Sequence, residues 1–213
     1  MRVSEDGREL RDLLPAVDRG RVLLGITGAP GSGKSTLALT LAGLAADVAV
    51  VPLDGFHLAD VELVRRGLLE RKGAPETFDA WGYAALLARL RVRPDHVVMA
   101  PGFERDLEQP LAGAVPVPPA TSLVLTEGNY LLLDEPAWRS ARAALDAVWH
   151  VVVDPAVRRT RLVARHIASG KAPAAAAAWV NRVDEPNALL VEAARGSADL
   201  LLDLTDWSGP TGG

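Results

Sequence analysis

The sequence predicts an α/β fold in which one parallel sheet is covered by helices on both faces. Short apolar runs alternate along the chain with helical stretches of about 10–15 residues, the pattern of successive βαβ units. The strand candidates are apolar almost throughout, which is typical of strands buried on both faces. A length of 213 residues suits one domain with a sizeable core, so we expect a single domain over 1–213.

Five buried strands are expected in the parallel sheet, each bounded by turn-forming or polar residues. They are Val22–Thr27, Val48–Leu53, Ser122–Thr126, Val148–Val153 and Asp199–Leu204. Val97–Ala100 and Val115–Val117 are shorter strand candidates in a proline-rich region. Ligands of parallel sheets bind beyond the carboxyl ends of the strands, so the polar residues that follow these strands are the first candidates for a site.

Six helices are expected between the strands. They are Ser35–Ala46, Leu58–Arg71, a helix that ends near Arg91, Pro155–Ser169, Pro173–Arg182 and Asn187–Ala194. Thr77 or Asp79 can cap the third helix, after a break at Gly73–Glu76. Pro155 stands in the first turn of its helix, where proline is favoured. Residues 208–213, SGPTGG, are expected to form a flexible tail.

The composition excludes several classes of protein. A formal net charge of −4 argues against a nucleic-acid binder that neutralises phosphates. There is no cysteine for disulfides or thiolate metal sites, and the four histidines lack metal-ligand spacing. No apolar run reaches the roughly 18 residues of a membrane span, and no signal-peptide core is found. We therefore expect a cytoplasmic protein without nucleic-acid or membrane partners, either a monomer or a homodimer.

A glycine-rich segment follows the first strand. Residues 28–35, GAPGSGKS, fit the phosphate-loop (P-loop) pattern G-x-x-x-x-G-K-[S/T] between a strand and a helix, the context that this motif requires. Lys34 would bridge the β- and γ-phosphates of a nucleoside triphosphate, and the Ser35 hydroxyl would bind Mg²⁺. The residues expected to bind the nucleotide are Gly28, Ala29, Pro30, Gly31, Ser32, Gly33, Lys34, Ser35 and Thr36.

The rest of the chain indicates which kind of P-loop protein this is. An N-K-x-D guanine-recognition motif is absent, and 213 residues are too few for the added domains of motor ATPases. We therefore expect a three-layer α/β/α P-loop NTPase fold that serves a small-molecule kinase. Asp54, at the end of the second strand, can take the proton of an acceptor hydroxyl. The alternative is a turn residue in an Asp-Gly pair.

Glu127 directly follows the buried strand Ser122–Thr126. An acid at such a position resembles the Walker B carboxylate, which holds Mg²⁺ directly or through water. The alternative is a helix or turn cap. The sequence leaves open whether Glu127 contacts the metal or the acceptor.

Three arginines share one face of the helix that begins at Pro155. Arg158, Arg161 and Arg165 recur at positions i, i+3 and i+7. They can close over a triphosphate as part of a small helical lid over roughly 155–182 and stabilise the charge of the transferring phosphoryl group. The alternative is a solvated basic face.

The order and spacing of these motifs resemble the P-loop kinases that include uridine kinase, phosphoribulokinase and bacterial pantothenate kinase. The similarity covers most of 22–203. It is carried by GAPGSGKST (28–36), LDGFH (53–57), RKGAPETFDAWGY (71–83), TEGNYLLL (126–133), DPAVRRTRLVARH (154–166) and DEPNA (184–188). The LDGF and RKG segments look particularly like pantothenate kinases and fructose-type sugar kinases. The resemblance implies that Asp54 is the acceptor-side base, that Glu127 is the strand-end acid and that the arginines belong to a lid.

The segment 100–110, APGFERDLEQP, departs from the family pattern. Uridine kinases usually have Tyr-Asp-Phe and a following His here, and pantothenate kinases have Tyr-Ser-His. Phe103, Glu104 and Arg105 occupy this place instead. We expect Phe103 and Arg105 to line the acceptor pocket together with His57; the alternative is a solvated loop with one buried Phe.

Taken together, these motifs predict a kinase that uses ATP and Mg²⁺ to phosphorylate a hydroxyl of a small molecule. In order of preference, the acceptor is a nucleoside or related metabolite, a sugar, or pantothenate. The alternative class is an ATP-binding regulator that kept the fold and lost the transfer. The chain has 20 arginines but only three lysines, and no role follows from the sequence for Lys72 or Lys171.

Overall fold

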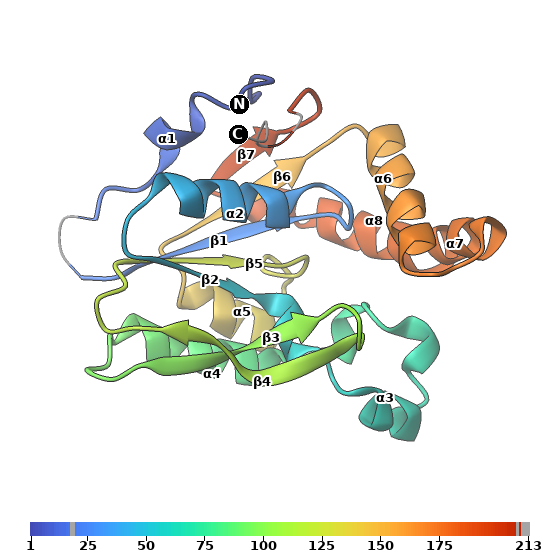
Figure 1. Cartoon of the computed structure of the whole chain (residues 1–213), viewed down its shortest axis with the longest axis horizontal. Helices are drawn as coiled ribbons and strands as arrows, with labels where there is room; N and C mark the ends of the chain where they lie inside the picture. Colours follow the sequence, from blue (N-terminus) through green and yellow to red (C-terminus); the bar gives the residue numbers. More distant parts are fainter. Residues whose placement is uncertain (18–19, 208, 210–213) are drawn as a thin grey trace.

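The computed structural model describes residues 1–17, 20–207 and 209. A sheet of five parallel strands lies at its centre, in the order β2–β5–β1–β6–β7 (Figure 1). The strands are β1 (Val22–Gly28), β2 (Val48–Pro52), β5 (Leu123–Glu127), β6 (Ala147–Val152) and β7 (Leu200–Asp203). All five expected strands are therefore present, and the expected parallel sheet is confirmed.

The strand register brings three carboxyl ends to the same level. In the pairing of β1 with β5, Ile26 lies opposite Glu127. In the pairing of β2 with β5, Pro52 also lies opposite Glu127. The segments that follow β1, β2 and β5 therefore start from one edge of the sheet, as expected for a ligand site of a parallel sheet.

Helices cover both faces of the sheet, which gives the expected three layers. On one face α1 (Leu10–Leu13) and α2 (Lys34–Leu44) pack on the side that buries Leu24. The other face buries Leu23. It is covered by α4 (Ala80–Arg91), α5 (Pro136–Ala143) and α8 (Glu185–Ala193). The alternation of Leu23 and Leu24 between the layers follows from the two-residue period of a strand.

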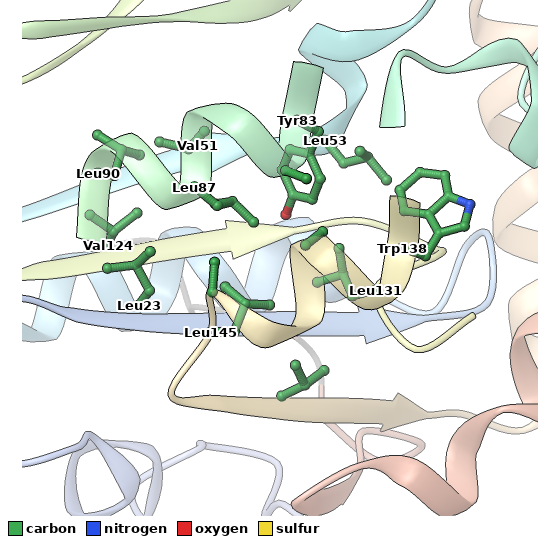
Figure 2. Packing of buried hydrophobic residues seen from close by; sticks show 14 of the residues in the cluster. Leu23, Val51, Leu53, Tyr83, Leu87, Leu90, Val124, Leu131, Trp138 and Leu145 are labelled. Atoms are coloured by element: carbon green, nitrogen blue, oxygen red, sulfur yellow. The ribbon is translucent and has the colours of Figure 1, made fainter. Parts of the chain in front are cut away.

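Figure 2 shows the larger of the two cores. Leu87 and Leu90 of α4 lie over Leu23 and Val124 of the sheet, and Trp138 of α5 closes one end. All of these side chains are buried. Full burial of each such side chain stabilises the fold by roughly 1.5–3 kcal/mol.

Helix α5 is an element that the sequence analysis did not predict. It has eight residues, and its N-cap Glu135 makes no side-chain capping hydrogen bond. Only Trp138 and Ala141 of the helix are buried. The start signal Pro136 is present in its first turn, but eight residues are fewer than the roughly 10–15 expected of a helix in this chain.

The expected helix Leu58–Arg71 is wrong in its length. Helix α3 covers only Asp60–Arg66, and a separate 3₁₀ turn follows at Leu69–Arg71. Gly67 lies between them with φ of +69°, and its N–H donates to carbonyl groups at the end of α3. This left-handed glycine ends the helix in the usual way for a C-terminal cap.

The two short strand candidates belong to a separate antiparallel hairpin. Strands β3 (Val98–Glu104) and β4 (Gln109–Val117) pair with each other outside the five-stranded sheet (Figure 1). The register shifts between Ala100 and Gly102, which marks a bulge. Both strands are longer than expected, so residues 105–108 form a hairpin tip.

The C-terminal helices lie at the edge where the strands end. Figure 1 shows α6 (Pro155–Ala168) and α7 (Pro173–Trp179) on one side of that edge and α3 on the other. The expected helix Pro173–Arg182 changes form: α7 ends at Trp179 and continues as a π-helical turn over Val180–Asp184. Short 3₁₀ turns also occur at Leu53–Phe56, Pro75–Thr77 and Arg195–Ser197.

Within the described residues, no helix is both long and apolar enough to cross a membrane. The predicted flexible tail at 208–213 falls outside the described residues, except for Gly209.

Candidate functional site

The loop between β1 and α2 is shaped by its glycines. Gly31 and Gly33 have φ values of +79° and +92°, which glycine adopts without strain. A Cβ atom at Gly31 would lie 2.7 Å from Cγ of Leu162 in α6. Helix α6 therefore packs so closely on the loop that no larger residue fits. The first N–H groups of α2 have no partners within the helix, so this loop is suited to bind an anion.

Lys34 and Glu127 are groups of opposite charge at the start of α2 and the end of β5; Lys34 is half-buried and Glu127 is buried. Burial lowers the pKa of Lys34, and the carboxylates of Glu127 and Asp54 act in the opposite direction. Burial raises the pKa of Glu127, while the Lys34 ammonium and a hydrogen bond from Ser35 oppose the rise. Glu127 is only 6% exposed. Electrostatic interactions with a bound phosphate are stronger here than in water because both groups are partly or fully shielded from solvent.

Asp54 lies in the 3₁₀ turn that follows β2. The next residue, Gly55, touches the hairpin: a Cβ atom there would lie 2.5 Å from the carbonyl oxygen of Pro101. Nδ1 of His57 lies 2.8 Å from the Asp54 carbonyl oxygen, so this nitrogen carries a hydrogen and donates it. Burial also lowers the pKa of His57, which keeps its ring neutral near pH 7.

Aromatic rings gather beyond Asp54. The His57 ring centroid lies 4.0 Å from that of Phe78 and 5.0 Å from that of Phe103. These rings come from the turn after β2, the segment before α4 and strand β3. A flat ring or the apolar face of a sugar could pack against such a surface.

Lys72 joins three elements around these rings. Its ammonium group donates to Oδ1 of Asp60 at 2.6 Å and to the backbone carbonyl of Glu108, and it lies 5.8 Å from the Phe103 ring centroid. The side chain is only 15% exposed. Lys72 therefore ties the loop before α4 to helix α3 and to the hairpin tip.

The three arginines of α6 have different surroundings. Arg161 and Arg165 line a cleft, whereas Arg158 does not. Arg158 is 6% exposed, and its guanidinium group donates to Oε2 of Glu185 at 2.7 Å and to the carbonyl of Pro30 at 3.4 Å. Beyond the helix, Nζ of Lys171 lies 5.0 Å from the ring centroid of Trp179.

One cleft of about 750 Å³ brings most of the predicted site residues together. The predicted residues that line it are Pro30, Gly31, Gly33, Lys34, Ser35, Thr36, Asp54, His57, Phe103, Arg105, Arg161 and Arg165. Glu127 does not line the cleft but interacts with Ser35, which does. Gly28, Ala29, Ser32 and Arg158 also lie outside its lining. A separate hollow of about 430 Å³ on the outer side of α2 is lined by Thr36, Leu39, Thr40, Gly43 and Leu44 and has no charged side chain.

Known proteins resemble this chain in sequence and in structure. A Schizosaccharomyces pombe protein that carries the name of a uridine kinase is 36% identical over 160 residues, covering 70% of this chain and 68% of that protein. An ATP-dependent kinase-like protein of Aspergillus versicolor is 38% identical over 133 residues, covering 59% and 77%. A crystal structure from Silicibacter sp. TM1040, described as a fructose transport system kinase, has a TM-score of 0.82 at 41% identity, covering 90% and 98%. No family model matches the chain.

The chain is a P-loop kinase. It belongs to the superfamily of the uridine kinase, phosphoribulokinase and pantothenate kinase type, as its motifs indicated. It is an ATP-dependent enzyme that acts on a small metabolite. The predicted family and fold class are thus confirmed.

The kinase offers oxygen ligands for the Mg²⁺ ion that its family implies. Within the described part of the chain, no group of three or more His, Asp or Glu residues forms a closed metal site. Mg²⁺ in phosphoryl-transfer enzymes is usually held by one or two protein oxygens together with phosphate oxygens and water. The Ser35 hydroxyl and the nearby Glu127 carboxylate supply such a partial set, so they fit Mg²⁺ that binds together with a nucleotide.

The polar residues that line the cleft of the kinase without having been singled out from the sequence include Asn129, Asp184 and Asn187. The Oδ1 atom of Asn129 is buried and has no hydrogen-bond partner among the described residues. The only sequence signal that Asn129 belongs to the site was its position two residues after Glu127. Asp184 and Asn187 belong to the DEPNA motif, which carried the family resemblance but no chemical role.

Proposed function

We propose that this kinase transfers the γ-phosphoryl group of ATP to a hydroxyl group of a nucleoside or a related metabolite. One observation carries the proposal: Lys34, Ser35 and Asp54 line the same cleft, and Glu127 interacts with Ser35 at its edge. A phosphate-binding loop and a carboxylate that can accept a proton are thus placed around one space. We include in the proposal a single domain over 1–213 with a lid over roughly 155–182.

The P-loop forms one side of the cleft. We call residues 28–36 together with α6 the nucleotide wall. The loop amides and Lys34 hold the triphosphate, and Ser35 and Glu127 hold Mg²⁺. When bound, Mg²⁺ neutralises part of the negative charge on the β- and γ-phosphates. The partial burial of Lys34 makes its attraction to the phosphate stronger, because less water competes for it.

The opposite side receives the acceptor. We call residues 54–57, 72–78 and 103–108 the acceptor wall. The Asp54 carboxylate orients the acceptor hydroxyl and takes its proton as the oxygen attacks the γ-phosphorus and the bond to the β-phosphate oxygen breaks. The neutral His57 ring and Phe103 pack against the rest of the acceptor, and Arg105 lies within reach of its polar groups.

The arginines of α6 complete the nucleotide wall. Arg161 and Arg165 line the cleft and stabilise the charge on the transferring phosphoryl group. Arg158 shares their helix face in the sequence, but it holds the carbonyl of Pro30 in the P-loop. We therefore assign Arg158 a supporting role in shaping the loop.

Two acceptor classes have specific support. The name of the S. pombe relative favours a nucleoside, and the aromatic rings around His57 suit a flat base. The description of the Silicibacter structure favours a fructose-type sugar. The structural match with this chain covers 98% of that protein. A nucleoside remains the first proposal and a sugar the second; pantothenate is third.

A coupled assay of ADP formation tests the proposal. Uridine, cytidine, D-fructose and pantothenate are each added to the purified protein with Mg²⁺ and ATP, and thermal shifts with a non-hydrolysable ATP analogue are recorded in parallel. We expect at least one acceptor to stimulate ADP formation and to raise the melting temperature further by mass action. Nucleotide binding without any stimulated turnover across a broader panel of hydroxyl compounds would instead identify an ATP-binding regulator.

A further inference from the structure

The segment Asp184-Glu185-Pro186-Asn187, which we call the DEPN segment, contacts both walls of the cleft. It ends the π-helical turn Val180–Asp184 and begins helix α8. Asp184 and Asn187 are buried although both border the cleft. Buried polar groups of this kind persist when they are fully paired, so their partners show what the segment holds in place.

Glu185 contacts the nucleotide wall. Its Oε2 atom accepts a hydrogen bond of 2.7 Å from Arg158, and its Oε1 atom lies 3.8 Å from Nη1 of Arg159. The same Arg158 guanidinium group donates to the carbonyl of Pro30. Arg158 thus connects Glu185 to the P-loop itself.

Asp184 adds a second tie to the same helix. Its Oδ2 atom accepts a hydrogen bond of 2.8 Å from Nε2 of His166. Two consecutive carboxylates therefore hold α6 at positions two turns apart. Because Leu162 lies between them and packs against Gly31, the position of α6 determines the shape of the loop.

Asn187 contacts the acceptor wall. Its Nδ2 group donates to the carbonyl oxygen of Gly73 at 3.3 Å, and the hydroxyl of Tyr130 donates to the same oxygen. Gly73 follows Lys72 and has φ of +99°, which favours glycine. The two donors fix the loop from which Lys72 reaches Asp60 and the hairpin tip.

Helix geometry explains how one short segment serves two walls. Residues two apart on an α-helix are separated by about 200° around its axis, so Glu185 and Asn187 point in nearly opposite directions. We propose that the DEPN segment is a brace between the walls, in which Glu185 is a positioning residue for the P-loop and Asn187 a positioning residue for the acceptor loop. The assignment of the two walls rests on the proposed function; the brace itself rests on the contacts.

Amide hydrogen exchange tests the brace without an acceptor. Exchange is compared for peptides over 28–37 and 69–78 in the wild-type protein and in the variants Glu185→Gln and Asn187→Ala. We expect Glu185→Gln to lower protection about 3- to 10-fold in 28–37 and to leave 69–78 unchanged, since the hydrogen bond from Arg158 loses its negatively charged acceptor and becomes weaker on one side only. Asn187→Ala should give the reverse pattern.

Two control variants accompany this experiment. Asn181→Ala changes an exposed residue of the same π-helical turn, and Asp134→Asn removes the exposed ion pair with Arg139. Neither should change exchange in either peptide. If Glu185→Gln does not fold, Arg158→Lys replaces it, because a lysine cannot hold Glu185 and Pro30 together. Equal loss of protection in both peptides from each variant, or loss in neither, would overturn the brace.

Steady-state kinetics give a second readout once the assay has identified an acceptor among uridine, cytidine, D-fructose and pantothenate. We expect Glu185→Gln to raise the KM for ATP about 3- to 10-fold with little change in the KM for that acceptor, and Asn187→Ala to do the opposite. An equal rise in both constants would indicate general loosening. If no acceptor is turned over but the exchange pattern splits, the brace stands and the proposed function fails.

Discussion

The two walls of the cleft differ in how the chain builds them. The phosphate-binding part of the nucleotide wall is local: residues 28–36 form the loop and the start of α2, and α6, from far along the chain, packs over it. The acceptor wall is assembled from residues 54–57, 72–78 and 103–108, which are joined by long-range contacts such as those of Lys72. The motif of the local wall indicates its ligand, whereas the LDGFH and RKG segments of the assembled wall indicate a family without its acceptor, and 103–108 departs from the family pattern.

This difference has a physical cause. A P-loop depends on backbone conformations that only particular residues adopt, so the requirement appears directly as glycines at fixed spacing. An acceptor pocket depends on which side chains converge, and many combinations can form one. Substrate choice can therefore change in the acceptor wall while the nucleotide wall stays constant.

Apart from a change at Asp54, the largest effect should follow from a change in the nucleotide wall. We expect Lys34→Arg to lower kcat by about 10²–10³-fold, because the larger guanidinium fork does not fit a half-buried site built for an ammonium group. Steady-state ADP formation measures the loss. The reverse exchange at an exposed site, Arg8→Lys, is the control and should leave kcat unchanged. A Lys34→Arg enzyme with wild-type kcat would show that Lys34 does not contact the phosphates.

A change at Gly55 should affect the acceptor wall selectively. A Cβ atom at Gly55 would lie 2.5 Å from the carbonyl oxygen of Pro101, so Gly55→Ala must displace the hairpin. We expect a loss of about 1–3 kcal/mol in the free energy of unfolding, a higher KM for the acceptor and an unchanged KM for ATP. Urea denaturation and steady-state kinetics measure these quantities.

The same substitution at Gly43 provides the matched control. Gly43 lies within α2, and a Cβ atom there would meet nothing within 4 Å. Gly43→Ala should therefore stabilise the protein by roughly 0.5–1 kcal/mol, because alanine is the better helix former. If both variants changed stability in the same direction, the contact between Gly55 and the hairpin would not determine the outcome.

The smallest predicted effect concerns pH. Burial raises the pKa of Glu127 above its ordinary value of 4.5, so the folded chain holds this proton more tightly than the unfolded chain. Stability is then lost as the pH rises from 4.5 through the folded pKa, by about 1.4 kcal/mol per unit of difference. Urea denaturation of wild type and Glu127→Gln over this range isolates the contribution. A wild-type protein that gained stability relative to Glu127→Gln across this range would contradict it.

The sequence predicted the sheet well because each strand is a distinct apolar run. All five strands and the P-loop were recognised. Because the strands are parallel, the residues that follow them lie at one edge of the sheet, where Lys34 and Asp54 line the same cleft. Helix α5 was missed because its eight residues are fewer than the roughly 10–15 expected of a helix, although Pro136 stands in its first turn. The helix expected over 58–71 was too long because its charged pattern continues past Gly67, where the backbone turns left-handed.

The candidate site was less predictable where its geometry depends on tertiary contacts. The spacing of Arg158, Arg161 and Arg165 indicated one helix face, yet Arg158 is directed to Glu185, a residue of another helix. No sequence pattern relates those two positions. Lys72 had no assignable role for the same reason, since its partners lie on α3 and at the hairpin tip.

The central claim is that Asp54 accepts the proton of the acceptor hydroxyl. The most direct measurement compares single-turnover phosphoryl transfer by wild type, Asp54→Asn and the exposed control Asp95→Asn, with nucleotide affinity determined for each. The account predicts that Asp54→Asn loses about 10²–10⁴-fold in the transfer rate while its affinity for the non-hydrolysable ATP analogue stays close to wild type. Transfer by Asp54→Asn at the wild-type rate would contradict it.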